Sequence, residues 1–266
     1  MKKVAASAVL GLAFIAQSCS NEKAVSSQKV VNGSMAFYFE QPAVVLLYDQ
    51  SSDSTCTGTF LNDHQVLTAA HCTGSFDVDY DTGEVDGTMH VLFVDDLASG
   101  DARVFASSTS IYRNPNWDIA GSGVNSADLA IVNFPKGTWG TKANISSRRA
   151  KVGDEVELFG YGINQDEDPY DSSSATVFRK GTNVIEKIGE GFIAFEGYSY
   201  DVSGDGSFAS SGHGDSGGPL LVDGEIVGVV SGGLPPSYSG ENSTNYYVDI
   251  HSEESEAFLS HVLDKK

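Results

Sequence analysis

The chain has 266 residues, of which 36 are acidic and 16 are basic, so its formal net charge is −20. A protein this acidic is a poor partner for nucleic acid or for an anionic membrane, because its field repels phosphate groups. Its 29 glycines, against only 16 Lys and Arg, suit short strands joined by turns. A single all-β domain can reach this length, and we expect one here.

The first residues have the pattern of an export signal. Lys2 and Lys3 supply the positive start, and residues 4–16 are apolar but too short for a stable membrane span. Cys19 follows Ala-Gln-Ser, which resembles a bacterial lipoprotein box with alanine where leucine is most usual. Lipidation of Cys19 and ordinary removal of residues 1–18 both remain open. Either one predicts an exported protein, secreted or periplasmic.

A polar stretch without hydrophobic periodicity, residues 19–29, predicts a pro-segment ahead of the compact domain at 30–266. The first half of that domain has the apolar runs and turn residues of short strands. Asn62-Asp63 marks the turn between two of them. The expected strands cover residues 42–48, 57–61, 65–68, 91–94 and 104–112.

Three motifs carry the chemistry. They are Thr-Ala-Ala-His-Cys at 68–72, Asp-Leu-Ala-Ile-Val at 128–132 and Gly-Asp-Ser-Gly-Gly-Pro-Leu at 214–220. A serine hydroxyl is a weak nucleophile unless a histidine takes its proton, and the imidazole needs a carboxylate to fix its tautomer. The sequence therefore predicts that His71, Asp128 and Ser216 form a triad for acyl transfer. Asp118 is a second candidate acid, but Asp128 is favoured because a buried strand follows it.

The second half repeats the pattern of short strands, after a connection expected at residues 139–147. Asp223-Gly224 between two apolar strands predicts a hairpin turn. Ser252 can cap a final helix, in which Phe258 with Val262 and Leu259 with Leu263 form an apolar stripe. The expected strands cover residues 155–159, 184–188, 191–196, 219–222, 225–230 and 246–250.

Taken together, the three motifs resemble those of the chymotrypsin/trypsin-type serine endopeptidases. The serine motif also fits the nucleophile elbow of α/β-hydrolases, but in that fold the acid and the histidine follow the serine. Here only His251 and His261 follow Ser216, within the expected helix. The resemblance implies two six-stranded antiparallel β-barrels with a C-terminal helix. It also implies a monomer that hydrolyses protein or peptide substrates through an acyl-enzyme, without a cofactor.

The resemblance also implies a disulfide between Cys56 and Cys72, which bracket the strand and turn that deliver His71. Three cysteines leave one odd residue. That residue is Cys19, and a lipid thioether would account for it. Two unrelated buried thiols at 56 and 72 remain the alternative.

A zymogen is implied as well. Relatives carry a basic residue before a sequence such as Ile-Val-Gly-Gly, and here Lys29 precedes Val30-Val31-Asn-Gly. Cleavage would free the α-amine of Val30 to pair with Asp215, because a buried carboxylate needs a compensating charge. A separate trypsin-like protease is expected to make this cut, which would also release an anchor at Cys19. The alternative is that Val30 simply begins a strand.

Substrate-binding positions follow from the same resemblance. The amides of Gly214 and Ser216 are expected to form the oxyanion hole. Ser210 falls at the base of the primary pocket, with Ser231 and Gly233 along its wall and Asn245 opposite. A neutral base leaves a cationic side chain unpaired, so we expect a preference for uncharged, apolar or aromatic side chains.

Two further interpretations stay open. A protein that keeps the fold without catalysis, as a binding or adhesive module, is the alternative to the enzyme. The acidic run at residues 77–84 has alternating oxygens, but its glycine comes one place late for a calcium loop and no glutamate closes it. We therefore expect a solvated surface loop there and predict no metal.

Overall fold

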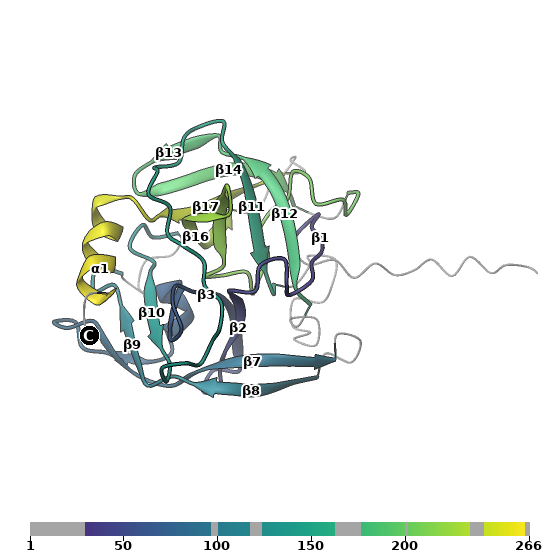
Figure 1. Cartoon of the computed structure of the whole chain (residues 1–266). Helices are drawn as coiled ribbons and strands as arrows, with labels where there is room; N and C mark the ends of the chain where they lie inside the picture. The colour runs from purple at the N-terminus through teal and green to yellow at the C-terminus, as the bar shows by residue number, and fades with distance from the viewer. Residues whose placement is uncertain are drawn as a thin grey trace, which may run out of the picture.

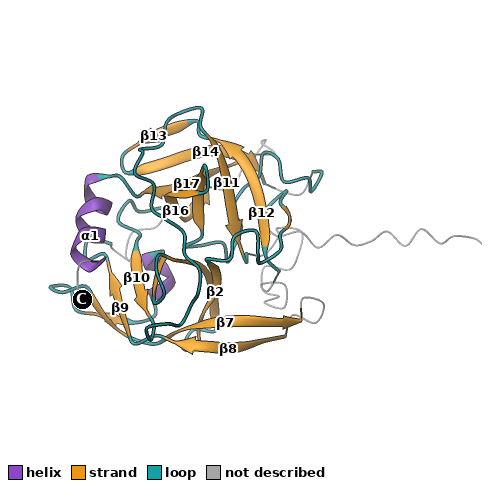
Figure 2. Cartoon of the chain, viewed as in Figure 1, coloured by secondary structure: helices purple, strands orange, loops and turns teal. Residues whose placement is uncertain are grey.

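The computed structural model describes residues 30–96, 101–117, 124–162, 177–199, 202–234 and 242–263. These residues form two antiparallel sheets, one mainly from each half of the chain, and one C-terminal helix, α1 (Glu253–Leu263) (Figure 1). Strands make up most of the regular structure (Figure 2). The expected all-β class with a C-terminal helix is confirmed. No helix among the described residues is long and apolar enough to cross a membrane.

The first sheet has nine strands in the order β5-β6-β9-β10-β4-β3-β2-β7-β8. Its core is lined by Leu47, Phe60, Val66 and Ile111, all fully or almost fully buried. The strands are β2 (Val44–Asp49), β3 (Ser54–Phe60), β4 (Gln65–Thr68), β5 (Asp77–Val78), β6 (Glu84–Asp86), β7 (Met89–Asp96), β8 (Asp101–Ser107), β9 (Ser110–Arg113) and β10 (Ala130–Asn133).

The second sheet has eight strands in the order β1-β12-β11-β15-β16-β17-β14-β13. Leu158, Ile193, Phe195 and Tyr247 belong to its core. The strands are β1 (Ser34–Met35), β11 (Glu155–Gly160), β12 (Arg179–Val184), β13 (Lys187–Gly189), β14 (Phe192–Tyr198), β15 (Pro219–Val222), β16 (Glu225–Leu234) and β17 (Asn242–Asp249).

A third apolar cluster joins the two halves. It combines Leu67 and Ile131 from the first sheet with Leu221 and Val229 from the second, and the buried face of α1 packs into it through Phe258 and its neighbours. The helix begins as expected, because the Ser252 hydroxyl accepts the amide of Ser255 at 3.1 Å. The two sheets therefore pack against each other through this third cluster.

The connection at residues 139–147 contacts both halves. The Trp139 indole donates to the carbonyl of Pro42 at 2.7 Å, and its ring stacks on Phe60 at 5.3 Å between centroids. Ile145 then forms an isolated bridge with Ile226 of β16. This segment carries the chain from the first sheet to the second.

Some strands differ from those expected. Residues 104–112 form parts of two strands, because β8 pairs with β7 whereas β9 pairs with β10, and the chain changes partner at 108–109. Strand β12 was not expected, because its sequence Arg-Lys-Gly-Thr-Asn-Val has no apolar alternation. It is a strand because β1 and β11 supply hydrogen-bonding partners on its two edges.

Candidate active site

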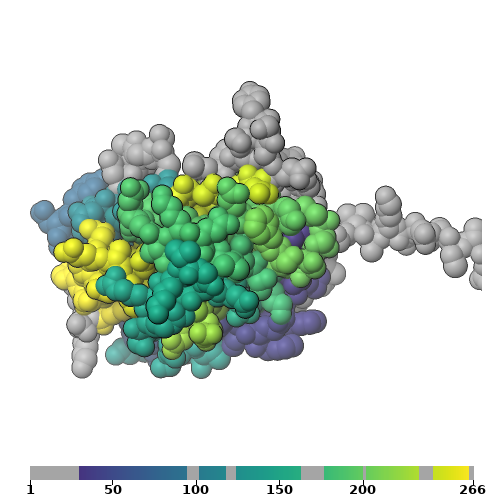
Figure 3. All heavy atoms as spheres, turned by 90° about the horizontal axis from the view of Figure 1, so that it is seen from above, coloured from purple at the N-terminus to yellow at the C-terminus, as the bar shows by residue number. Residues whose placement is uncertain are grey.

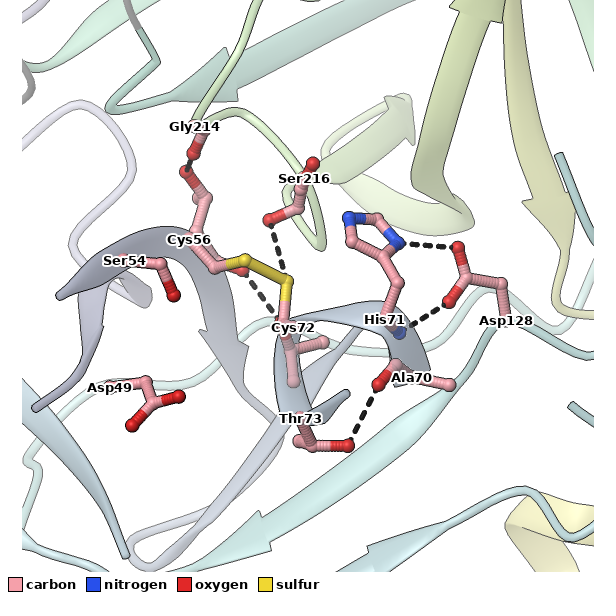
Figure 4. The surroundings of a disulfide bond; sticks show 12 residues. Asp49, Ser54, Cys56, Ala70, His71, Cys72, Thr73, Asp128, Gly214 and Ser216 are labelled. Carbon is pink, nitrogen blue, oxygen red and sulfur yellow. Dashed lines mark hydrogen bonds and ion pairs between the residues drawn. A yellow bond between two sulfur atoms is a disulfide. The ribbon is translucent and has the colours of Figure 1, made fainter. Parts of the chain in front are cut away.

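His71 lies on a short 3₁₀ helix, η1 (Ala70–Thr73), that follows β4. Its backbone amide donates to Asp128 Oδ1 at 2.8 Å, and its ring Nδ1 donates to Asp128 Oδ2 at 2.7 Å (Figure 4). A carboxylate can only accept hydrogen bonds, so the Nδ1 proton belongs to the imidazole. This tautomer leaves Nε2 with a lone pair that can take a proton.

Asp128 immediately precedes Leu129 and β10 and is only 2% exposed. Besides the two bonds from His71, Oδ2 accepts the Ser231 hydroxyl at 2.7 Å. Three donors therefore hold the buried carboxylate of Asp128 in one orientation. Asp128 thus presents a fixed hydrogen-bond acceptor to the histidine ring. The predicted choice of Asp128 over Asp118 agrees with this geometry, and Asp118 lies outside the described residues.

Ser216 projects from a tight loop that precedes β15. Gly214 and Gly217 adopt φ values of +93° and +80°, which side chains with a Cβ rarely tolerate. The Gly218 amide closes the bend by donating to the carbonyl of Asp215 at 2.8 Å. Figure 4 shows Ser216 on the side of the imidazole that faces away from Asp128. The three predicted residues thus lie together in one site.

The serine loop is held against the first sheet by Thr57. The Thr57 amide donates to the carbonyl of Ser216 at 2.8 Å, and its hydroxyl donates to the carbonyl of Gly214 at 2.9 Å. A Cβ on Gly217 would lie 2.1 Å from Thr68 Oγ1 and 2.5 Å from Thr57 O. The histidine and the serine come from different halves, and this close approach brings them together.

Cys56 and Cys72 form the implied disulfide, with Cα atoms 6.1 Å apart. Cys72 follows His71 directly, and its Sγ lies 3.6 Å from the carbonyl oxygen of Ser216 (Figure 4). The bridge thus packs against both the histidine turn and the serine loop. The potential metal-ligand atoms of Cys56, His71 and Cys72 lie within 4.8 Å of one another. However, both cysteine sulfurs are bonded to each other in the disulfide, so neither is a free thiolate that could bind a metal.

Two of the predicted pocket residues, Ser210 and Asn245, belong to a buried polar network. Ser210 is fully buried, and its hydroxyl accepts the Asn245 side-chain amide at 3.0 Å. Asn245 Oδ1 accepts the backbone amide of Ser211 at 2.9 Å. Gly233 pairs with Asn245 between β16 and β17 and is exposed. Ser210 and Asn245, the two residues expected at the base and on the opposite wall, thus bond directly to each other.

Asp215 is buried beside the serine, with 2% of its surface exposed. Its carboxylate accepts the amides of Gly162 at 2.8 Å and Gly212 at 2.7 Å. A Cβ on Gly160 would lie 2.0 Å from Asp215 Oδ1, so this position must be glycine for the acid to fit. Burial, and next the charge of Asp215, raise the pKa of the Tyr247 hydroxyl well above its ordinary value.

Val30 and Val31, the first described residues, are each 1% exposed. Val31 bridges to Ser210, and the Ser210 amide donates to its carbonyl at 3.1 Å. Val30 packs with Leu158 and Ala209 in the core of the second sheet. Lys29 and Cys19 lie outside the described residues.

Two residues that hold this site together, Thr57 and Arg113, could not be identified from a sequence motif. Thr57 stands within an ordinary strand pattern, and Arg113 ends β9 as a single basic residue. Arg113 is 4% exposed, and its Nε donates to Thr73 Oγ1 at 2.9 Å, at the end of η1. Only the folded chain brings β9 beside the histidine turn.

The acidic run forms a hairpin of β5 and β6. Asp79 Oδ1 accepts the amides of Asp81 at 2.9 Å and Thr82 at 3.2 Å, so this carboxylate closes the turn. Asp77, Asp79 and Glu84 border an open cavity of about 590 Å³ on this hairpin. The turn geometry accounts for Asp79 without a metal.

Comparisons with known proteins identify the family of this chain. Residues 30–253 match the protein-family model described as Trypsin. A factor V activator from Macrovipera lebetinus is 28% identical over 233 residues, covering 79% of this chain and 80% of its own. Trypsin 5G1 from Aedes aegypti is 26% identical over 223 residues, covering 81% and 79%.

Among solved structures, neuropsin, described as a serine protease expressed in the limbic system of mouse brain, aligns with a TM-score of 0.61. It is 20% identical and the alignment covers 87% of this chain and 99% of that chain. The likeness is one of fold, and it agrees with two β-barrels. None of these relatives bears on the resemblance of residues 16–19 to a bacterial lipoprotein box.

Proposed function

The chain belongs to the Trypsin family and is a serine-type endopeptidase, and we propose that it cleaves peptide bonds through His71, Asp128 and Ser216. The observation that carries the proposal is the Asp128–His71 pair, which leaves His71 Nε2 on the side of Ser216 (Figure 4). In the first step the Ser216 hydroxyl attacks the substrate carbonyl while its proton moves to Nε2. Asp128 stabilises the imidazolium that forms.

The tetrahedral intermediate collapses when the C–N bond breaks and His71 returns the proton to the leaving amine. Water then attacks the acyl-enzyme with His71 again as base, which regenerates Ser216. The amides of Gly214 and Ser216 would bind the developing oxyanion. In support, no hydrogen bond within the described part of the chain uses either amide. Each such donor commonly contributes about 3 kcal/mol to transition-state stabilisation.

Covalent labelling with a fluorophosphonate tests this assignment. The processed wild-type enzyme should be labelled, Ser216→Ala should not be, and its turnover of peptide esters should fall by several orders of magnitude. Ser203→Ala, a serine in a loop outside the site, is the matched control and should label normally. Wild-type turnover by Ser216→Ala would refute the triad. An unlabelled processed wild-type protein would favour the non-catalytic binding module.

We further propose that the protein is exported as a precursor and activated by cleavage between Lys29 and Val30. The new α-amine would compensate the buried carboxylate of Asp215. The burial of Val30 and Val31 supports this, since a freed amine at Val30 would already lie in the core of the second sheet.

The backbone at Val30 supports the same cut. Its φ is +53°, in the left-handed region that β-branched residues avoid. Such a conformation costs about 1–3 kcal/mol. The torsion φ is defined by the carbonyl carbon of the preceding residue, so cleavage after Lys29 removes the constraint. Activation would then release strain and gain an ion pair at once.

Processing experiments separate the parts of this proposal. Lys29→Gln should leave an uncut precursor that labels weakly, whereas Lys23→Gln, another lysine of the pro-segment, should be processed normally. Because the neutral pocket is a poor site for lysine, a separate protease is expected to make the cut, and a Ser216→Ala precursor should still be processed. Its accumulation uncut would show self-activation. An active enzyme that begins at Cys19 would overturn the zymogen proposal.

The last part of the precursor proposal is that Cys19 carries a lipid. A lipid at Cys19 would hold the precursor at a membrane, and cleavage after Lys29 would release a monomeric domain of residues 30–266. Mass spectrometry of the exported precursor tests this directly. A diacylglyceryl mass on the N-terminal peptide, lost in Cys19→Ser, is the expected result, and an unmodified Cys19 in the membrane fraction contradicts it.

A further inference from the structure

An aromatic cluster stands exposed just after the first described residues. Met35, Phe37, Tyr38 and Phe39 are 57%, 56%, 75% and 64% exposed. Phe37 and Phe39 stack on each other at 5.3 Å, and Tyr38 meets Phe39 edge-on at 5.9 Å. The rings thus contact one another while most of their surface faces outward. We call residues 35–39 the aromatic loop.

The aromatic loop is held firmly by the fold. Met35 pairs with Arg179 of β12, and the buried Ala36 donates its amide to the carbonyl of Phe178 at 3.0 Å. A tight turn closes the loop, in which the Glu40 amide donates to the carbonyl of Phe37 at 2.9 Å. An apolar surface presented in one fixed conformation loses little conformational entropy when something covers it.

The loop is also poor in charge, although the protein is strongly acidic. Glu40 is the sole charged residue between positions 30 and 48, and its carboxylate accepts a hydrogen bond from Lys180 Nζ. This bond, and next that from the amide of Phe37, lower the pKa of Glu40. The nearest charge is therefore paired. A surface with exposed Phe, Tyr and Met and no net charge suits the interface of a neutral bilayer.

The position of the loop in the chain favours a membrane as its occupant. The loop begins at Met35, six residues after Lys29, where the proposed pro-segment ends. A linker of about ten residues spans at most about 35 Å, so a lipid on Cys19 would keep the loop close to the bilayer. In Figure 3 purple atoms from the early part of the described chain lie at the surface of the molecule. Asn32 lies three residues before the aromatic loop. Its side-chain Oδ1 accepts hydrogen bonds from the backbone amides of residues 202–204, which fixes this part of the chain to the loop at 202–204.

We propose that the aromatic loop is a membrane-contacting surface that inserts Phe37, Tyr38 and Phe39 into the interface of a zwitterionic bilayer. Aromatic rings prefer this depth, where the ring is surrounded by apolar groups and the tyrosine hydroxyl stays hydrated. The contact orients the precursor on the membrane and weakly retains the cleaved enzyme. The tether rests on the export and lipidation proposed above, whereas insertion of the loop does not.

Vesicle sedimentation tests insertion with the full chain exported as Cys19→Ser, so that no lipid is attached. The protein should bind phosphatidylcholine vesicles, and Phe37→Ser/Tyr38→Ser/Phe39→Ser should bind about tenfold or more weakly. Tyr80→Ser/Val152→Ser is the matched control, since these side chains are 69% and 63% exposed elsewhere on the surface. After cleavage at Lys29, both variants should keep wild-type fluorophosphonate labelling, which separates loss of binding from loss of the catalytic site.

Charge gives a second discriminating result. Adding phosphatidylglycerol should weaken binding because the protein carries a net charge of −20, and salt should restore it by screening.

Should the triple variant fail to fold, Phe39→Trp serves instead. The emission of its new indole should shift to the blue with vesicles and be quenched by brominated lipids.

Three results would overturn the proposal. The first is equal vesicle binding by the triple variant and the parent. The second is indole emission in Phe39→Trp that brominated lipids leave unquenched. The third is a concentration-dependent dimer that the triple variant abolishes, with no vesicle binding, because this would assign the surface to a second copy of the chain.

Discussion

Arg113 donates from Nε to Thr73 Oγ1 at 2.9 Å, and Thr73 stands two residues after His71. The guanidinium also donates to the carbonyls of Thr73 and Phe76, and it lies 5.0 Å from the ring of Trp117. Thr73 Oγ1 in turn donates to the carbonyl of Ala70 at 2.7 Å, which closes η1 around the histidine. One buried side chain of β9 thus fixes the turn that carries His71, the proposed base.

We predict that Arg113→Met lowers kcat about tenfold with little change in KM. Removal of the guanidinium leaves buried acceptors unpaired, at about 1–3 kcal/mol each, and loosens the turn around His71. Urea unfolding and steady-state kinetics on a peptide ester measure the two effects. Arg113→Lys keeps the charge but not the forked geometry, so it should recover only part of both. Wild-type kcat in Arg113→Met would show that the contact does not position His71.

Ser231 is expected to act through Asp128 as well as along the pocket wall. Its hydroxyl donates to Asp128 Oδ2 at 2.7 Å, and a hydrogen bond to a charged group contributes about 1.5–3 kcal/mol. Ser231→Ala should therefore lower kcat/KM roughly tenfold, mainly through kcat. Ser231→Thr, which keeps the hydroxyl, should retain most of the activity. Equal losses in the two variants would instead assign the effect to the backbone of the pocket wall.

The proposed primary pocket should prefer uncharged side chains, because Ser210 and Asn245, the residues expected to line it, bond to each other. A peptide-library profile measures this preference directly. Asn245→Gly should shift it toward larger aromatic side chains, since removal of the side chain deepens the pocket. Ser210→Asp should raise cleavage after Lys and Arg, because a buried carboxylate would then pair with the cation. A wild-type profile dominated by Lys and Arg would contradict the assignment.

Asp49 should make stability depend on pH. Burial raises the pKa of Asp49, but hydrogen bonds from Ser52, Ser75 and Ser51 outweigh this effect, and the pKa lies below its usual 3.8. A carboxyl group with a lowered folded-state pKa stabilises the fold above the unfolded value, and this contribution is lost as the pH falls through the folded value. Its stabilisation is thus present at pH 7 and fades below about pH 4.

Urea unfolding of the wild type and Asp49→Asn at pH 7 and pH 3 checks this. The difference in free energy of unfolding between the two proteins should be largest at pH 7 and shrink at pH 3. Exposed Asp53→Asn, in the same β2–β3 turn region, is the control and should show a smaller change. A constant difference across this range would mean that Asp49 acts by packing alone.

The catalytic assignments could be made from local sequence because each one is carried by a short motif. His71, Asp128 and Ser216 stand in runs whose neighbours also match their structural roles, such as the apolar residues of β10 after Asp128. The glycines around Ser216 could also be interpreted from the sequence, as positions where a side chain would not fit. The structure agrees, because Gly214 and Gly217 have positive φ values and a Cβ at Gly217 would contact its neighbours too closely. The strands with apolar runs, such as β4 and β15, were predicted at their observed bounds.

What the sequence by itself determined is therefore the class of fold, the residues proposed to react and the bends that present them, because propensity, turn chemistry and the motifs are local properties. The tertiary structure decided which distant groups touch. Only the pairing of β1 and β11 on its two sides makes a strand of the polar residues of β12. Likewise, Thr57 reaches the serine loop and Arg113 reaches the histidine turn only after strands far apart in the chain have packed. Such contacts depend on the register of whole sheets, which no short run of residues encodes.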